Sequence, residues 1–590
     1  MNVLKRIIDA YKSVWNLIEK KQKISFLIIM FLTILSSLSE ALSVGLIIPF
    51  LTVLLDVTVL LDNKYTLFFI NIMGLKDINN IRLFITGIFL ASILISGLLR
   101  VTLIYTNIRL AQHIRHNLSC YLYINNLHID YEESIKRNSS EIVSLIKSKT
   151  VSVASSFFLE ISKIISSFIL CVIILTLLFT INYKIAGLCF FIFGSFYILI
   201  TIFTKSRMSL YSKTISLLDP KSIKLLNEGL GVRKDIIINN AHFFYNNLFK
   251  QVDYIITRIS ANIQIIASTP RILIESFALI VLIISGYILA IKVDSMIEIM
   301  PIFAAFVLAA QKLLPQLQQM YASWVLISES LESVNDVLIE LDRKNITKNK
   351  FLSKTIAFKS HIEFNDIEYS YSKDVTPVLK NFNIKINKGD KIGLIGGTGA
   401  GKSTFIDIFM GLLTPQKGKI TVDNTQLIKN NINNWQSNIS HVPQSIFLAD
   451  VSVLENIAIG IPTKEIDIKL AIKAAKEAHI HEVIEKWSEG YNTIIGEAGV
   501  KLSGGQRQRI GLARCFYRKR KIIILDEATS ALDITTEKRV LDKFFKSNND
   551  RTIIICTHRV DTLRQCDYVI KITNGKLSKR INTKVLNLSK

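Results

Sequence analysis

Long apolar runs dominate the chain up to about residue 325, and only short ones occur after about residue 355. A helix needs roughly 20 apolar residues to cross the hydrocarbon of a bilayer. Six stretches have the required character, with approximate bounds 24–55, 83–105, 153–181, 185–203, 272–291 and 297–314. The later runs have the lengths of strands and core helices. The pattern predicts a membrane domain over 1–325, a linker over 326–355 and an α/β domain over 356–590.

The spacing between the apolar runs predicts the sidedness of the loops. Only residues 182–184 join the third and fourth runs, and 292–296 join the fifth and sixth. The connections after the second and fourth runs are long, helical in pattern and rich in Lys and Arg, which places them in the cytosol together with both termini. We expect a basic amphipathic helix over 1–23 on the cytosolic membrane surface. We expect residues 56–81 to form either a loop with a small external helix over 65–75 or a disordered connection.

The composition changes this picture little. The net charge is +24 and the mean hydropathy is +0.37. The Lys and Arg residues accompany the cytosolic loops and are not interleaved with aromatic residues in a basic patch, so we expect no nucleic-acid partner. The six cysteines form no C-x-x-C pair, which argues against a disulfide framework or a metal site.

Ionisable residues also lie inside or at the edges of the predicted spans: Glu40, Arg100, Lys163, Arg271, Glu275 and Lys312. Charges at membrane depth usually face a bundle interior or an aqueous cavity. Those near the ends of spans can instead reach the headgroups or form structural pairs, and Arg271 and Glu275 are four residues apart on one predicted helix. We select Arg100 and Lys163 as candidates for binding an anionic substrate.

A phosphate-binding pattern, G-x-x-x-x-G-K-[ST], stands in the second half of the chain. Its residues are Gly396, Gly397, Thr398, Gly399, Ala400, Gly401, Lys402, Ser403 and Thr404. An apolar run over 391–395 predicts a strand before it, and 405–413 predicts a helix after it, which is the context that such a loop requires. Backbone N–H groups and the helix N-terminus can then converge on phosphate oxygens. We expect Lys402 to reach the β- and γ-phosphates of ATP, and the Ser403 hydroxyl to bind Mg²⁺.

Two carboxylates, Asp526 and Glu527, follow another predicted strand at 522–525. Their position after the strand predicts that Asp526 holds Mg²⁺ and that Glu527 polarises the attacking water as general base. Together with the phosphate loop, this pair predicts ATP hydrolysis.

The segment Leu502-Ser503-Gly504-Gly505-Gln506 is similar to the signature motif of the ABC transporter family. The resemblance covers about 362–575 and implies that the signature of one chain grips the γ-phosphate held by a second chain. It also implies roles for Tyr371 (adenine stacking), Gln444 (Mg²⁺ contact), Glu497 (coupling), Asp533 (the loop that crosses the dimer) and His558 (γ-phosphate contact). Because no motif is degenerate, a homodimer with two active sites is expected.

The order of the domains resembles a half-size ABC exporter of the type IV fold, with MsbA-like architecture. This resemblance implies an α-helical six-span transmembrane domain followed by an α/β P-loop ABC ATPase domain. It also implies short coupling helices near 130–139 and 231–241, in the two long cytosolic loops.

The membrane half also resembles PglK-type lipid-linked oligosaccharide flippases, in residues 39–50, 182–184 and 269–272. This resemblance implies ATP-driven movement of a polyprenyl-diphosphate-linked oligosaccharide across a bacterial inner membrane. Arg100, Lys163 and Arg271 are candidates for compensating the diphosphate, although structural positive charges would give the same pattern. The alternatives are export of another lipid, a drug or a peptide. A soluble mechanical ATPase and a nucleotide-gated channel fit the six spans and the intact Glu527 less well.

Overall fold

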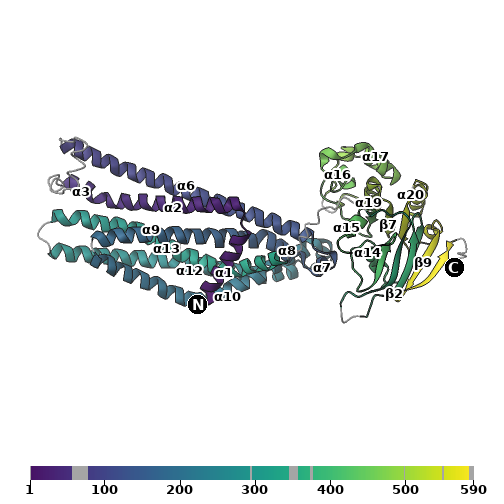
Figure 1. Cartoon of the computed structure of the whole chain (residues 1–590), viewed down its shortest axis with the longest axis horizontal. Coiled ribbons are helices and arrows are strands. Elements are labelled where there is room, and N and C mark those ends of the chain that lie inside the picture. Colours follow the sequence, from purple (N-terminus) through teal and green to yellow (C-terminus); the bar gives the residue numbers. More distant parts are fainter. Residues whose placement is uncertain are drawn as a thin grey trace. The chain divides into compact units, whose positions relative to one another are not determined.

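The computed structural model describes residues 2–55, 78–181, 183–292, 296–343, 356–372, 376–496, 499–547, 550–557 and 559–583. The chain divides into two compact units, one made of 1–129 with 135–346 and the other of 130–134 with 347–590. The described part of the first unit is helical, and the second contains the strands (Figure 1). This division agrees with the predicted order of a helical domain followed by an α/β domain.

Long helices running side by side form the first unit (Figure 1). Its helices are α1 (Asn2–Leu17), α2 (Lys20–Gly45), α3 (Ile47–Leu55), α6 (Ile78–Leu127), α7 (Tyr131–Lys136), α8 (Ser139–Ser144), α9 (Leu159–Ile181), α10 (Tyr183–Gly231), α11 (Arg233–Ile238), α12 (His242–Lys292) and α13 (Met296–Asp342). Two π-helical turns, Leu145–Lys149 and Ser152–Phe158, connect α8 to α9. Residues 131–134 of α7 group with the second unit.

The six predicted spans all fall in helices of this unit. Three helical segments of the described chain are long and apolar enough to cross a membrane: Lys20–Leu55, Ile78–Leu127 and Ser139–Thr180. The other three predicted spans lie within α10, α12 and α13. The short α7 and α11 lie where the coupling helices are predicted.

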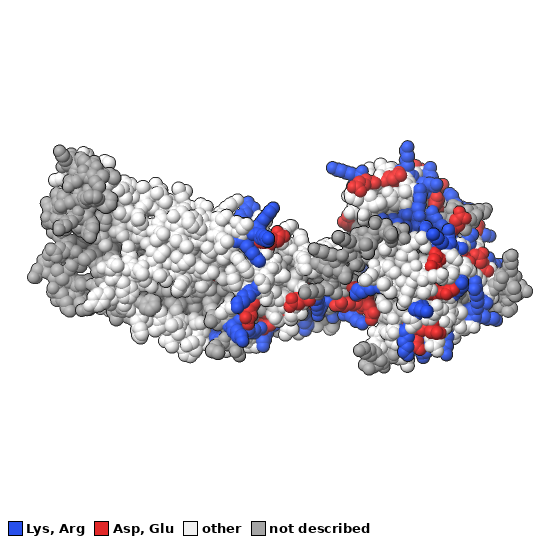
Figure 2. All heavy atoms as spheres, in the orientation of Figure 1, with Lys and Arg blue, Asp and Glu red and all other residues white. Residues whose placement is uncertain are grey.

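The surface of these helices is apolar over a long stretch. Leu83, Leu94 and Leu98 of α6 are 77%, 67% and 69% exposed. On the face drawn in Figure 2, much of the described surface of this unit carries no charged side chain, and its Lys, Arg, Asp and Glu residues gather toward one end. Exposed apolar surface of this extent indicates contact with lipid or with another chain.

One prediction for this unit differs from the structure. Residues 326–342, assigned to the linker, continue α13 as far as Asp342, because Ile327, Leu331, Val334, Val337 and Leu341 recur at helical spacing and pack into the helical core. Of the helix predicted over 1–23, Asn2–Leu17 forms α1 and packs Val14 into the same core, and its place on a membrane surface stays a prediction. The prediction of an external helix at 65–75 lies outside the described residues.

The second unit carries the ATPase motifs. Its strands are β1 (His361–Tyr369), β2 (Leu379–Asn387), β3 (Lys391–Ile395), β4 (Lys417–Val422), β5 (Thr425–Gln426), β6 (Ile439–Val442), β7 (Ile522–Asp526), β8 (Thr552–Cys556), β9 (Tyr568–Thr573) and β10 (Lys576–Asn582). Its α-helices are α14 (Lys402–Phe409), α15 (Ile432–Gln436), α16 (Val453–Ile457), α17 (Ile468–Glu477), α18 (His481–Glu485), α19 (Gly504–Arg518), α20 (Ile534–Ser547) and α21 (Val560–Leu563). Two short 3₁₀ turns, Thr463–Glu465 and Gly490–Asn492, complete the described elements.

Two sheets organise this unit. One has the order β2-β1-β4-β5 and is antiparallel, and the other has the order β10-β9-β3-β8-β7-β6. In the larger sheet β6, β7, β8, β3 and β9 are parallel. All of β8 is buried, as expected for a strand in the middle of a sheet covered on both faces. Strands predicted at 391–395 and 522–525 are confirmed as β3 and β7.

The parallel pairing determines where the motifs lie. Carboxyl ends of parallel strands meet at one edge of a sheet, which is where α/β proteins bind ligands. The phosphate loop follows β3, Glu527 follows β7 and Gln444 follows β6. The helix predicted at 405–413 is α14, which begins at Lys402 and ends at Phe409, because Gly411 has a φ of +68° and interrupts the helix.

Candidate functional site

The phosphate loop requires glycine at specific positions. Gly399 and Gly401 have φ values of +77° and +104°, a region that residues with a Cβ rarely adopt. A Cβ on Gly396 would lie 2.5 Å from the carbonyl oxygen of Ile572 in the neighbouring strand. The loop therefore passes tightly over the sheet before it enters α14.

The same loop has the features of a phosphate cradle. Gly397 and Gly399 face open space, so nothing in the described protein fills the volume beside their Cα atoms. Gly401 precedes α14 without a side-chain cap, which leaves the first N–H groups of this helix available. The Lys402 ammonium donates to the carbonyl oxygens of Gly396 (2.8 Å) and Gly397 (3.1 Å), and therefore lies over the loop. These groups fit the phosphates of ATP.

Two carboxylates at the end of β7 face the neighbouring motifs. Burial raises the pKa of Asp526, and the nearby Lys402 ammonium opposes that shift. Glu527 adopts a φ of +48°, which is unusual for a residue with a Cβ and typical of functional sites. Its Oε2 accepts a hydrogen bond from the Gln444 amide at 2.8 Å.

These side chains are suited to Mg²⁺. The Ser403 hydroxyl, the Gln444 amide oxygen and the Asp526 carboxylate offer the hard oxygen ligands that the ion prefers, and Mg²⁺ usually takes few protein ligands besides water and substrate phosphates. Among the described residues, no three His, Cys, Asp or Glu side chains cluster as a metal site. One hydroxyl, one amide oxygen and one carboxylate leave coordination positions that water and ATP oxygens can fill.

The predicted adenine-stacking residue lies next to the phosphate loop. The Tyr371 hydroxyl is 3.1 Å from the hydroxyl of Thr404, in α14. Tyr371 is 42% exposed, whereas Tyr369 is fully buried and contacts the Tyr371 ring edge-on at 5.2 Å. Exposure favours Tyr371 over Tyr369 as the ring that could receive a base.

The signature residues form the start of α19. The Ser503 hydroxyl accepts a hydrogen bond from the Gln506 N–H, and the Gln506 side chain accepts one from the Ser503 N–H. This capping box holds exposed Ser503 at the helix N-terminus. Gln508, which lies just outside the signature motif, binds Ser530 and the backbone of Ala531. It therefore ties the signature helix to the loop that contains Asp533.

Three further ATP-site predictions have different outcomes. The Asp533 carboxylate accepts hydrogen bonds from Thr535 and Thr536 at the start of α20, which lowers its pKa. Asp533 therefore caps a helix within its own chain. Glu497 and His558 lie outside the described residues.

Next to His558 in sequence, Arg559 forms contacts that the sequence analysis did not identify. Its guanidinium pairs with buried Glu537 and donates to the carbonyl oxygens of Ser530 and Leu532. Glu537 also accepts hydrogen bonds from two threonine hydroxyls. The sequence signal for these contacts is weak, because the partners of Arg559 lie more than 20 positions away in the chain. Its position directly after His558 is the one local hint.

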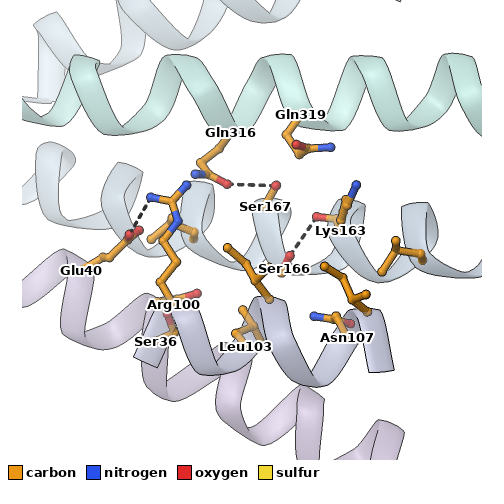
Figure 3. A pocket seen from close by; sticks show the side chains of 15 residues that line it. Ser36, Glu40, Arg100, Leu103, Asn107, Lys163, Ser166, Ser167, Gln316 and Gln319 are labelled. Carbon is orange, nitrogen blue, oxygen red and sulfur yellow. Dashed lines mark hydrogen bonds and ion pairs between the residues drawn. The ribbon is translucent and has the colours of Figure 1, made fainter. Parts of the chain in front are cut away.

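A second candidate site lies in the first unit. A cavity of about 320 Å³ is lined by α2, α6, α9 and α13, and both Arg100 and Lys163 line it (Figure 3). The remaining wall combines leucine and isoleucine side chains with hydroxyl and amide groups, and Ser167 donates to Gln316 at 2.9 Å. The cavity therefore combines two cations, one carboxylate and neutral hydrogen-bonding groups, inside helices that are apolar on the outside.

Both cations are paired with buried acids. Arg100 donates to Glu40 at 3.1 Å, and Lys163 donates to Glu160 at 2.6 Å. Glu40 and Glu160 are 3% and 4% exposed, so each carboxylate depends on its partners. The side chains of Arg100 and Lys163 are 48% and 38% exposed, which leaves part of each accessible.

The third predicted substrate residue does not join this cavity. Arg271 pairs with Glu275 at 3.0 Å on α12, as expected from their spacing, and neither residue lines the cavity. Their side chains are 62% and 41% exposed. The structure therefore brings together two of the three predicted cations.

Comparison with known proteins agrees with this architecture. The family model described as ABC transporter matches residues 379–530. The ATP-dependent lipid A-core flippase of Wigglesworthia glossinidia brevipalpis is 30% identical over 476 residues, which are 80% of each chain. The alpha-hemolysin translocation ATP-binding protein HlyB of Escherichia coli O157:H7 is 33% identical over 322 residues, 54% of this chain.

The alignment with HlyB spans only 45% of that protein, and the one with the multidrug export protein YgaD of Bacillus subtilis spans 38%. The chain thus spans less than half the length of these two relatives. A solved structure titled as a bacterial Atm1-family ABC exporter with ATP bound shares the fold, with a TM-score of 0.78, 17% identity and 96% of both chains covered. Because the flippase is matched over most of its length, the chain belongs to the ABC transporter family, with an ATPase domain that follows a helical transmembrane domain.

Proposed function

We propose that this exporter is an ATP-driven flippase that moves a polyprenyl-diphosphate-linked oligosaccharide from the cytosolic to the outer leaflet of a bacterial inner membrane. One observation carries the proposal: Arg100 and Lys163, from two different helices, line the same cavity of the transmembrane unit. A diphosphate headgroup that leaves water needs cationic partners and hydrogen-bond donors. The serine, asparagine and glutamine groups of the wall suit the hydroxyls of a sugar.

ATP binding in this proposal follows the motifs. Gly396, Gly397, Thr398, Gly399, Ala400, Gly401, Lys402 and Thr404 surround the phosphates, and Tyr371 stacks on adenine. Ser403, Gln444 and Asp526 would hold Mg²⁺, which would supply positive charge to offset the phosphate oxygens. Glu527 then orients and polarises the attacking water, with Gln444 fixing its carboxylate. His558 contacts the γ-phosphate.

A second copy of the chain completes each ATP site. Ser503, Gly504, Gly505 and Gln506 lie at the N-terminus of α19, where Ser503 is exposed and can meet a phosphate bound to the partner. The intact Glu527 in each chain would give two active sites. A homodimer with closed two-fold symmetry satisfies this requirement with one gene product.

The charge distribution supports an orientation with both termini in the cytosol. Lys and Arg residues gather toward one end of the described helical unit, as cytosolic extensions do. The apolar surface of α6 would face lipid or the second chain.

One relative supports a related cargo. The lipid A-core flippase match covers 80% of this chain, which favours lipid over drug or peptide as the transported class. The matches to a hemolysin translocator and a multidrug exporter cover less of this chain. Another anionic lipid is therefore the second candidate.

The test is flipping of a fluorescent polyprenyl-diphosphate oligosaccharide in proteoliposomes with the purified full-length protein. We expect ATP-dependent movement that Glu527→Gln abolishes and Arg100→Ala and Lys163→Ala strongly reduce. Arg109→Ala is the matched control, because Arg109 is an exposed cation of α6 that does not line the cavity. ATP hydrolysis without movement of this lipid would refute the oligosaccharide cargo and leave the ATPase assignment in place.

A further inference from the structure

A buried carboxylate in a site for an anion needs an explanation. Glu40, on α2, is 3% exposed and lines the cavity that Arg100 also lines. It would repel a diphosphate if its charge were free. Figure 3 shows Glu40 and Arg100 pointing toward one another, with an ion pair between them.

Glu40 has two cationic neighbours on different helices. Its Oε1 is 3.1 Å from Arg100 on α6 and 3.9 Å from Lys312 on α13. Only the contact with Arg100 is short enough for a hydrogen bond. One carboxylate therefore balances two cations, and the three groups together carry one net positive charge.

An incoming anion changes which partner Glu40 prefers. When a headgroup phosphate binds Arg100, that guanidinium is shared between two anions that repel each other. Leaving Glu40 unpaired is unfavourable, because a buried charge without a partner is strongly destabilising. Lys312 is the alternative cation within reach.

Lys312, the second cation near Glu40, lies on a helix that could transmit a change in this pairing. Helix α13 is one continuous helix from Met296 to Asp342. Besides Lys312 it carries Gln316 and Gln319 in the cavity wall, and Ser323, which donates to Glu160 at 2.6 Å. A displacement at Lys312 therefore acts on a helix that already contacts the cavity at several points.

We infer that Glu40 is a positioning residue that moves from Arg100 to Lys312 when an anionic headgroup binds, and so couples occupancy of the cavity to α13. The inference rests on the proposed function, because it takes the cargo to be an anionic lipid. In the empty site Glu40 neutralises and orients Arg100. In the loaded site the phosphate takes Arg100, and Glu40 and Lys312 form the new pair.

The test uses the full-length transporter in lipid nanodiscs, with farnesyl diphosphate as a prenyl diphosphate probe. Probe affinity and probe-stimulated ATPase activity are measured on the same samples. We expect the probe to raise wild-type ATPase activity about fivefold, at the low end of typical coupling factors. Glu40→Gln is expected to bind the probe as tightly as wild type or more tightly and to lose the stimulation, because the exchangeable charge is gone.

Glu332→Gln is the matched control. Glu332 also lies on α13 and pairs with an arginine, Arg6, at 2.9 Å, but it does not line the cavity. This variant is expected to retain wild-type affinity and stimulation. Stimulation that survives in Glu40→Gln would overturn the exchange and leave the proposed function standing.

Lys312→Gln decides the question if Glu40→Gln does not fold. The exchange predicts lost stimulation with unchanged probe affinity, because Lys312 pairs with Glu40 and not with the headgroup. A loss of affinity as large as that of Arg100→Ala would show direct headgroup contact by Lys312 and would overturn the exchange. A wild-type protein that neither binds nor responds to the probe would overturn the diphosphate cargo, and this inference with it.

Discussion

The Gln444 amide donates a hydrogen bond of 2.8 Å to the carboxylate of Glu527. Gln444 follows β6 and Glu527 follows β7, and these strands are parallel neighbours. Glu527 is further fixed by its backbone N–H, which donates to the carbonyl oxygen of Cys556 at 3.0 Å. A residue in an unfavourable backbone conformation is thus held by two neighbouring strands, as expected where the side chain must be aimed at a reacting water.

Replacing Glu527 by glutamine is expected to lower the ATPase rate at least about 100-fold, the usual size of a general-base contribution. ATP affinity should change little, because the shape of the side chain and the phosphate loop are kept. Phosphate release and binding of a fluorescent ATP analogue measure the two effects separately. Rapid hydrolysis by this variant would show that another group activates the water.

Two neighbouring glycines of the phosphate loop should respond differently to alanine. In Gly396→Ala the new Cβ would lie 2.5 Å from a backbone oxygen, and overpacking of this kind costs about 1–3 kcal/mol. Gly397 faces open space, so the free energy of unfolding of Gly397→Ala should lie within about 0.5 kcal/mol of the wild-type value. Its methyl group would nevertheless intrude on the phosphate face and weaken ATP binding.

Thermal unfolding of the full-length protein without nucleotide, followed by ATP titration, distinguishes the two glycine variants. Gly396→Ala should show the lower unfolding temperature, and Gly397→Ala should show normal unfolding with reduced ATP affinity. The reverse order of unfolding temperatures would contradict the argument that glycine is required at position 396 because its backbone lies close to the Ile572 carbonyl oxygen.

The strands that position the phosphate loop and Glu527 were predictable, because a short apolar run directly precedes each motif. The runs before Gly396 and Asp526 are apolar and short, and parallel strands place their carboxyl ends at one edge wherever they stand in the order. That Asp533 caps α20 was not predicted, although an Asp just before a helix is a local capping signal, and Thr535 and Thr536 bind its carboxylate.

The transmembrane half was less predictable for a different reason. The partner of a charged residue inside a membrane depends on which helices pack together, and Glu40 meets Arg100 from 60 positions away. The Arg271–Glu275 pair was predicted from spacing, because its members are four residues apart on one helix. The Glu160–Lys163 pair, three residues apart on α9, carries the same kind of local signal. The helical conformation of 326–342 could have been predicted, since apolar residues recur there every three or four positions.

Removing Arg559 is expected to destabilise the ATPase domain. Arg559→Gln leaves the buried Glu537 carboxylate without its cation, and breaking such a pair costs about 3 kcal/mol or more. The double variant Arg559→Gln/Glu537→Gln removes both charges and should recover part of this loss. Unfolding of the full-length proteins in denaturant gives both values, and a double variant less stable than the single one would refute the pairing argument.

The histidine at the end of β6 should make stability depend on pH. Burial lowers the pKa of His441 to about 4, from an ordinary value of 6.5, and its Nε2 has no hydrogen-bond partner among the described residues. In the unfolded chain His441 therefore binds a proton below about pH 6.5, whereas in the folded chain it binds one only below about pH 4. The stability contribution is complete above pH 6.5 and is lost as the pH falls through this window, by about 2 kcal/mol between pH 7 and pH 5.

His441→Leu cannot titrate and should flatten the pH dependence of unfolding by that amount. Equal slopes in the two proteins, measured by denaturant unfolding at several pH values, would show that another group governs acid stability.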